Sequence, residues 1–141
     1  HVLLGTLYGM QIAARPHTIL WRGRKVSHHR SKALSTGSDN PRVHYLLGMS
    51  AFHAPSIIGN KNEALALLRK AEKLFQAERT EKASALTPAW GYVHCLVFIA
   101  ETYSELGNRK KAESYYRKAL TINPEHRLAK KGLKKNLKTE E

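Results

Sequence analysis

The chain has 141 residues, the length of one domain, and its formal net charge is +13 at neutral pH. Hydrophobic residues make up 42% of it, which is enough for a core, but no apolar run approaches the roughly 20 residues that cross a bilayer. The first residues lack the basic leader and cleavage site of a secretory signal. These features predict that the chain has no membrane-spanning helix. They leave two kinds of function open, peptide binding and polyanion binding.

Residues 1–40 contain an incomplete version of a two-helix pattern. Leu4-Gly5-x2-Tyr8 is typical of a first helix, and Ala33-Leu34 before the turn residues 38–41 is typical of the end of a second. Arg15-Pro16 interrupts the pattern, and we predict a basic inserted loop there. Because the first helix begins partway through, we expect further residues before His1.

The basic insert carries no acidic residue between positions 15 and 32. Its cations are Arg15, Arg22, Arg24, Lys25, Arg30 and Lys32. Clustered cations favour nucleic acid or another polyanion, although they also suit a solubilising surface. Trp21 is the only aromatic residue there, so no base-stacking motif is present. We predict that His28 and His29 are surface residues, because adjacent histidines cannot both reach one metal from a single helix face.

Residues 41–87 repeat the pattern more clearly. Its first helix reads His44-x2-Leu47-Gly48-x2-Ala51, and its second reads Ala64-x3-Leu68-x2-Ala71. Residues 52–62 contain Pro55 and Gly59 and predict an inserted loop. Asn60 or Asn62 is expected to cap the second helix, which continues to Arg79.

Residues 88–123 carry the clearest copy, which reads Leu96-x2-Ile99-Ala100-x2-Tyr103, then Leu106-Gly107, then Ala112-x3-Tyr116-x2-Ala119, before Pro124. The alanines recur where two helices must cross closely, and residues 106–108 predict a tight turn. The lone Cys95 lies in an apolar run, so we expect a buried thiol and no internal disulfide. Residues 124–138 predict a capping helix with Leu128, Leu133 and Leu137 on its apolar face and lysines opposite.

This pattern resembles the tetratricopeptide repeat, W-x2-L-G-x2-Y…A-x3-F…A…P, with substitutions of similar size. The resemblance implies one all-α domain over residues 1–141, an antiparallel helix-pair solenoid of about three repeats with a C-terminal capping helix. The spacing between copies exceeds the usual ~34 residues, which is similar to elongated repeats of bacterial proteins. Periplasm and cytoplasm both remain open. The resemblance implies no enzymatic activity, and we expect no cofactor and no metal. A metal site shared among His17, His28 and His29 is the lesser alternative to surface histidines.

In such arrays the first helices line a concave groove. The resemblance therefore places partner-binding residues at Arg42, Tyr45, Met49, Phe52 and His53 of the second copy, and at His94 and Glu101 of the third. Aromatic residues beside an arginine suit an extended or helical peptide, but the same side chains could pack against the preceding repeat. Both interpretations remain open. Some family members clamp a C-terminal carboxylate with Lys and Asn, which the matching positions here lack.

The sequence therefore predicts a non-enzymatic scaffold that binds a protein or peptide. The alternative is a polyanion-binding module that uses the basic insert and the lysine-rich tail, and a structural dimer is a third possibility. No Gly-rich phosphate loop and no H-E-x-x-H motif supports catalysis.

Overall fold

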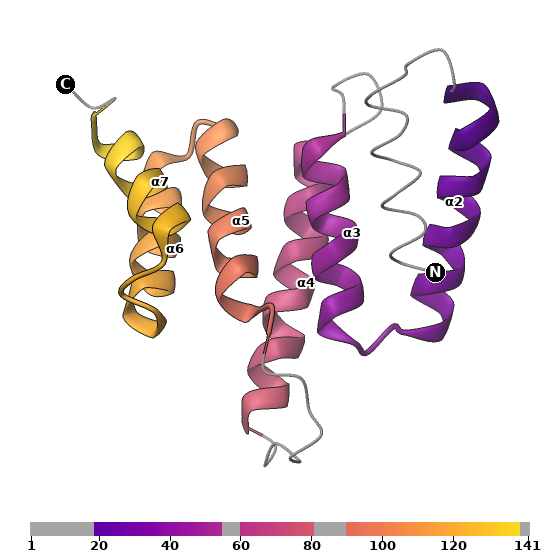
Figure 1. The fold of residues 1–141 in the computed structure, drawn as a ribbon, viewed down its shortest axis with the longest axis horizontal. Helices are drawn as coiled ribbons and strands as arrows, with labels where there is room; N and C mark the ends of the chain where they lie inside the picture. Colours follow the sequence, from indigo (N-terminus) through magenta and orange to yellow (C-terminus); the bar gives the residue numbers. More distant parts are fainter. Residues whose placement is uncertain (1–18, 55–59, 81–89, 139–141) are drawn as a thin grey trace. The chain divides into compact units, whose positions relative to one another are not determined.

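The computed structural model describes residues 19–54, 60–80 and 90–138, and for residues 19–26 it describes the backbone alone. Within these ranges the chain forms helices and no strand (Figure 1). The helices are α2 (Ile19–Thr36), α3 (Pro41–His53), α4 (Lys61–Thr80), α5 (Tyr92–Glu105), α6 (Arg109–Ile122) and α7 (Arg127–Lys138). The predicted all-α class with paired helices is confirmed. The chain forms two compact units, His1–Leu74 and Phe75–Glu141, which are described in turn.

Helix α2 corrects the prediction of a basic loop, because residues 19–36 form one continuous helix. No proline occurs between His17 and Asn40, and Arg, Lys, Ala and Leu all favour helix; Gly23 is the residue that opposes it most, at a cost of about 1 kcal/mol. Helix α2 packs on α3 and buries Ala33. Its sequence is rich in charged residues, so few apolar residues are present to indicate a helical spacing.

Helix α3 begins with a complete cap. The Asn40 side-chain oxygen accepts a hydrogen bond from the Arg42 backbone N–H at 2.9 Å, and Pro41 occupies the first turn, where no N–H is needed. Close packing with α4 depends on Gly48, because a Cβ atom there would lie 2.7 Å from Leu68 Cγ. Leu68 and the motif alanines Ala64 and Ala71 are fully buried.

The connection from α3 to α4 is shorter than the predicted insert of residues 52–62. Phe52 and His53 complete the last turn of α3, and α4 begins at Lys61, so only residues 54–60 lie between the two helices. Asn60 caps α4 by accepting a hydrogen bond from the Asn62 N–H at 2.9 Å. Pro55 and Gly59 lie outside the described residues.

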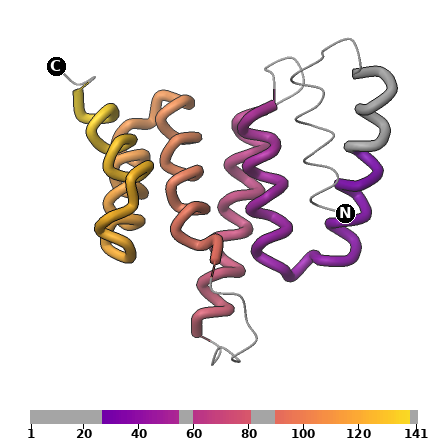
Figure 2. Tube along the Cα trace, viewed as in Figure 1, coloured from indigo at the N-terminus to yellow at the C-terminus, as the bar shows by residue number. Residues whose placement is uncertain are grey.

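In the second unit, α5 and α6 form a tightly joined antiparallel pair (Figure 2). The predicted turn is confirmed: Gly107 has φ of 77°, and the Asn108 side chain caps α6 by accepting from the Lys111 N–H at 3.2 Å. Ala100, Ala112 and Ala119 have no exposed surface, as expected where two helices cross closely. Helix α6 ends at Ile122, just before Pro124.

Helix α7 packs on α6 through small side chains rather than through leucines. Its buried residues are Ala129 and Asn136, and Gly132 lies against the Tyr116 ring. Leu133 is half-buried, but the predicted apolar face is wrong for Leu128 and Leu137, which are 48% and 38% exposed. These two leucines are nine positions apart, about two and a half helical turns, so they lie on opposite sides. Residues 129, 132 and 136 follow the three-to-four spacing of one face instead.

Candidate functional site

The predicted groove residues of the first unit divide into buried and accessible sets. Arg42, Tyr45 and Phe52 are buried in α3, Met49 is half-buried and His53 is exposed. The Tyr45 hydroxyl donates to the Met49 sulfur at 3.8 Å. Of the two interpretations left open for Tyr45 and Phe52, their burial supports packing within the fold.

Phe52 is enclosed by its neighbours at the end of α3. The Lys61 ammonium lies 3.8 Å from the centre of the Phe52 ring and also donates to the Phe52 carbonyl, while the His53 ring meets Phe52 edge-on at 5.1 Å. Cation–π contacts of this kind contribute about 0.5–2 kcal/mol. Phe52 therefore stabilises the contact between the end of α3 and the start of α4.

The predicted basic patch falls mainly on α2. Arg30 forms an ion pair with Glu63 of α4, and Lys32 is exposed. Arg22, Arg24 and Lys25 lie on the α2 backbone within residues whose side chains are not described, and Arg15 lies outside the described residues. The Arg30–Glu63 pair neutralises one cation of this patch, so the patch presents less charge than its sequence indicates.

The predicted groove residues of the second unit lie on α5. His94 is exposed and Glu101 is half-buried. Burial raises the pKa of the Glu101 carboxyl above its usual range, the Glu105 carboxylate raises it further, and Lys135 of α7 partly offsets both. Burial also raises the pKa of the Tyr116 hydroxyl, and the charges of Glu101 and Glu105 add to the effect. Helices α5, α6 and α7 therefore share one electrostatic cluster.

His94 also meets the residue that starts α7. The His94 and His126 rings meet edge-on with centres 4.7 Å apart. His126 is buried, and its Nδ1 accepts a hydrogen bond from the Ala129 N–H at 3.3 Å, which caps α7. Burial and the neighbouring His94 lower the pKa of His126 below its usual range. An imidazole that accepts a backbone hydrogen bond through Nδ1 must be neutral, in agreement with this direction.

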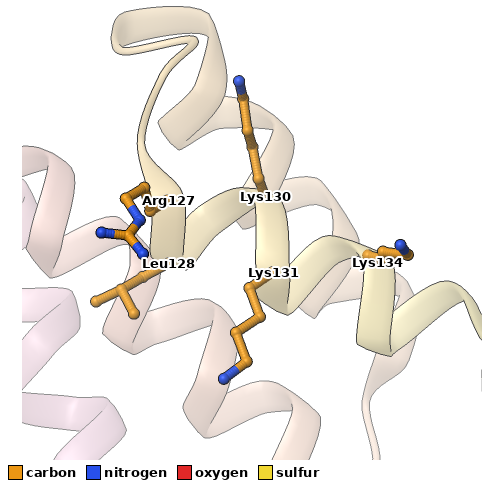
Figure 3. Close-up of a pocket in the computed structure, with 5 residues that line it drawn as sticks. All are labelled: Arg127, Leu128, Lys130, Lys131 and Lys134. Carbon is orange, nitrogen blue, oxygen red and sulfur yellow. The ribbon is translucent and has the colours of Figure 1, made fainter.

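The outer side of α7 borders a hollow that the sequence analysis missed (Figure 3). Its volume is about 670 Å³, and its lining residues are Arg127, Leu128, Lys130, Lys131 and Lys134. The spacing of the small residues Ala129, Gly132 and Asn136 could have revealed it, since that face must pack and the lysines with Leu128 must then face outward.

Neither a metal centre nor a membrane-spanning helix is found within the described ranges 19–54, 60–80 and 90–138. No group of three or more His, Cys, Asp or Glu side chains there could hold a metal ion. None of the helices in these ranges is both long enough and apolar enough to cross a bilayer.

Comparison with known proteins agrees with the geometry of α5 and α6. Residues 93–126 match the family model described as tetratricopeptide repeat. This range covers α5 almost entirely, all of α6, and the turn up to His126. No curated protein matches the chain. The match and the paired helices α5 and α6 together identify one tetratricopeptide repeat in this chain, at residues 93–126.

Proposed function

We propose that this chain is a non-enzymatic protein-interaction module that binds a peptide or protein segment along the first helices of its repeats. The observation that carries the proposal is the matched repeat at residues 93–126, since repeats of this kind serve as interaction scaffolds. Within that repeat, α5 keeps His94 exposed and Glu101 half-buried, and α6 completes the packing behind it.

The two α5 side chains offer complementary polar chemistry to a partner. His94 can donate or accept a hydrogen bond, and Glu101 can accept hydrogen bonds from peptide N–H groups or pair with a cation. They are seven residues apart, about two helical turns, so they lie on the same side of α5. In the first unit, His53 and Met49 are the accessible members of the predicted set, and Arg42, Tyr45 and Phe52 support them from within.

The test is co-purification with the intact chain, at low and at high salt, with and without nuclease, and with the retained proteins identified by mass spectrometry. The proposal expects a discrete protein that survives both treatments. Recovery only of material that is lost with salt or nuclease would overturn it.

A double variant, His94→Ala with Glu101→Gln, localises the binding. Retention of the captured protein is expected to fall about tenfold, because a polar contact between partners is worth about 1 kcal/mol or more. The matched control is Lys110→Ala with Ser114→Ala, two exposed positions on α6. Circular dichroism of both variants checks that they keep their helices, since His94 also touches His126.

Polyanion binding is the second candidate, and the charge of α7 favours it: this helix carries six Lys or Arg residues and no acid. Changing Arg22, Arg24 and Lys25 of α2, the other basic segment, to Glu should then weaken binding of a labelled single-stranded RNA, while a groove-bound protein stays attached. Retained RNA binding in this variant would remove α2 from the candidate surface.

A further inference from the structure

The hollow beside α7 combines positive charge with one exposed apolar side chain. Leu128 is 48% exposed and lines the hollow together with Arg127, Lys130, Lys131 and Lys134; Figure 3 shows Arg127 beside Leu128 and the lysines further along α7. Leu128 is the one apolar side chain among the five lining residues, and the other four are cations. The hollow is thus suited to a ligand with both negative charge and an apolar group.

Most of the positive charge in the hollow lacks an internal counter-charge. Lys130 pairs with Glu125 at 2.8 Å. Arg127, Lys131 and Lys134 are exposed, and the described part of the chain brings no carboxylate within ion-pair distance of them. Clustered like charges repel one another, so an anionic partner that approaches them gains free energy.

The geometry of α7 favours a peptide over a membrane or a nucleic acid. A helix that lies on a bilayer needs an apolar stripe along one side, but Leu128 and Leu137 lie on opposite sides of α7. Single-stranded nucleic acid is held by aromatic side chains that stack on bases, and none of the five lining residues is aromatic. An acidic peptide needs only the cations and one apolar contact, and the hollow has both.

We propose that the hollow beside α7 binds an acidic peptide segment, with an apolar side chain of that segment packed on Leu128 and its carboxylates paired with Arg127, Lys131 and Lys134. This proposal rests on the proposed interaction function and names the chemistry of the partner. Packing on Leu128 sets the register of the bound segment, since the flexible lysines adapt to carboxylates at several positions.

The test is fluorescence anisotropy with the intact chain and short labelled peptides. The first probe has one Phe flanked by Glu residues, and the second has Ser in place of Phe. A single-stranded RNA oligonucleotide and phosphatidylserine vesicles are titrated in parallel. The hollow variant is Arg127→Gln with Lys131→Gln and Lys134→Gln. Its matched control is Lys70→Gln with Lys73→Gln and Lys110→Gln, three exposed lysines outside the hollow.

The Phe peptide is expected to bind more tightly than the Ser peptide. The hollow variant should weaken binding of the Phe peptide about tenfold, because it removes three exposed ion pairs, each of which contributes modestly. The control should change affinity less than twofold. Leu128→Ser should remove the difference between the two peptides, which gives a second test that leaves the charge intact. All these positions are exposed, so we expect the helices to persist by circular dichroism.

Equal affinity of the hollow variant and the wild-type chain for the Phe peptide would overturn the proposal, as would equal affinity of the Phe and Ser peptides. Tighter binding of RNA or vesicles, lost in the hollow variant, would also overturn it and assign the hollow to a nucleic acid or a lipid surface. The co-purification experiment separates this failure from failure of the interaction function. If the hollow variant still captures the same protein, the proposed interaction function stands and only the proposal for the hollow is overturned.

Discussion

The middle helix pair, α3 with α4, and the last pair, α5 with α6, pack by the same rule but are joined differently. In the middle pair Ala51, Ala64 and Ala71 are buried, and in the last pair Ala100, Ala112 and Ala119 are buried. The last pair is joined by residues 106–108 alone, whereas residues 54–60 join the middle pair. Only the last pair falls within the family match.

This comparison separates two properties of a repeat motif, the small residues at the helix crossing and the length of the connection between the helices. Small side chains are buried in both pairs, whereas the connection between the two helices differs in length. A family pattern depends on both properties, so a longer connection hides a pair whose packing residues are unchanged. Four predictions test the comparison, beginning with the largest expected effect.

Enlarging a crossing alanine tests whether the two pairs share one packing rule. Ala64→Leu in α4 and Ala112→Leu in α6 should each lower the free energy of unfolding by about 1–3 kcal/mol, because a leucine overfills a site with no exposed surface. Urea unfolding followed by circular dichroism measures the loss. Ala66→Leu, at an exposed position of α4, is the control and should be nearly neutral. A large loss of stability in one pair alone would show that the two pairs do not share one packing rule.

Substitution of the two glycines of the motif, Gly48 and Gly107, should lower the free energy of unfolding for different reasons. Gly48→Ala is expected to cost about 1 kcal/mol, because the strain against Leu68 exceeds the gain in helix propensity. Gly107→Ala should cost about as much through its positive φ, since no atom lies within 4 Å of the added Cβ. Asparagine distinguishes the two: it tolerates positive φ but is larger than alanine. Gly107→Asn should lose less than Gly107→Ala, and Gly48→Asn should lose more than Gly48→Ala.

The caps of the second helices should be equivalent. Asn60→Ala and Asn108→Ala each remove a side-chain acceptor from a helix N-terminus and should each cost about 1 kcal/mol. Replacement by Ser or Asp should restore most of the stability in both pairs, as measured by the urea midpoint. A neutral Asn60→Ala would show that the longer connection leaves α4 less dependent on its cap.

The smallest effect concerns the pH dependence of α7, which packs on the last pair. The folded-state pKa of His126 lies below its usual range, and in the unfolded chain it returns to about 6.5. Below that pH the unfolded state binds more protons, so stability should fall as pH drops from about 6.5 toward the folded-state pKa. Protonation would also place a cation beside His94 and at the helix N-terminus.

The matched variant for this prediction is His126→Asn, which keeps a capping acceptor without an imidazole. Its urea midpoint should vary less between pH 7 and pH 5 than that of the wild-type chain. Identical pH profiles would assign the dependence to other histidines.

Local patterns predicted the elements whose signals lie close together in sequence. The turn at residues 106–108, the crossing alanines and the stop before Pro124 each depend on a few neighbouring residues, and the structure confirms them. The end of helix α2 at Ala33-Leu34 was predicted, but its earlier turns were predicted as a loop, because charged residues there give no apolar spacing to detect.

The candidate site was harder to predict, because burial depends on residues far away in sequence. An aromatic side chain on a first helix can face a groove or a neighbouring helix, and its spacing is the same in both cases. Tyr45 and Phe52 are buried, while the accessible Leu128 was expected to pack. The prediction for α7 relied on leucines where the packing face consists of Ala129, Gly132 and Asn136, since small residues let α7 approach Tyr116.

The single cysteine of the chain has a practical consequence. Cys95 lies on α5 with no exposed surface, so a thiol reagent can reach it only when the surrounding helices separate. Its rate of modification therefore reports how often the matched repeat opens, without an introduced label. A bound partner that holds this repeat closed would slow the reaction, and the slowing would measure how strongly binding opposes opening.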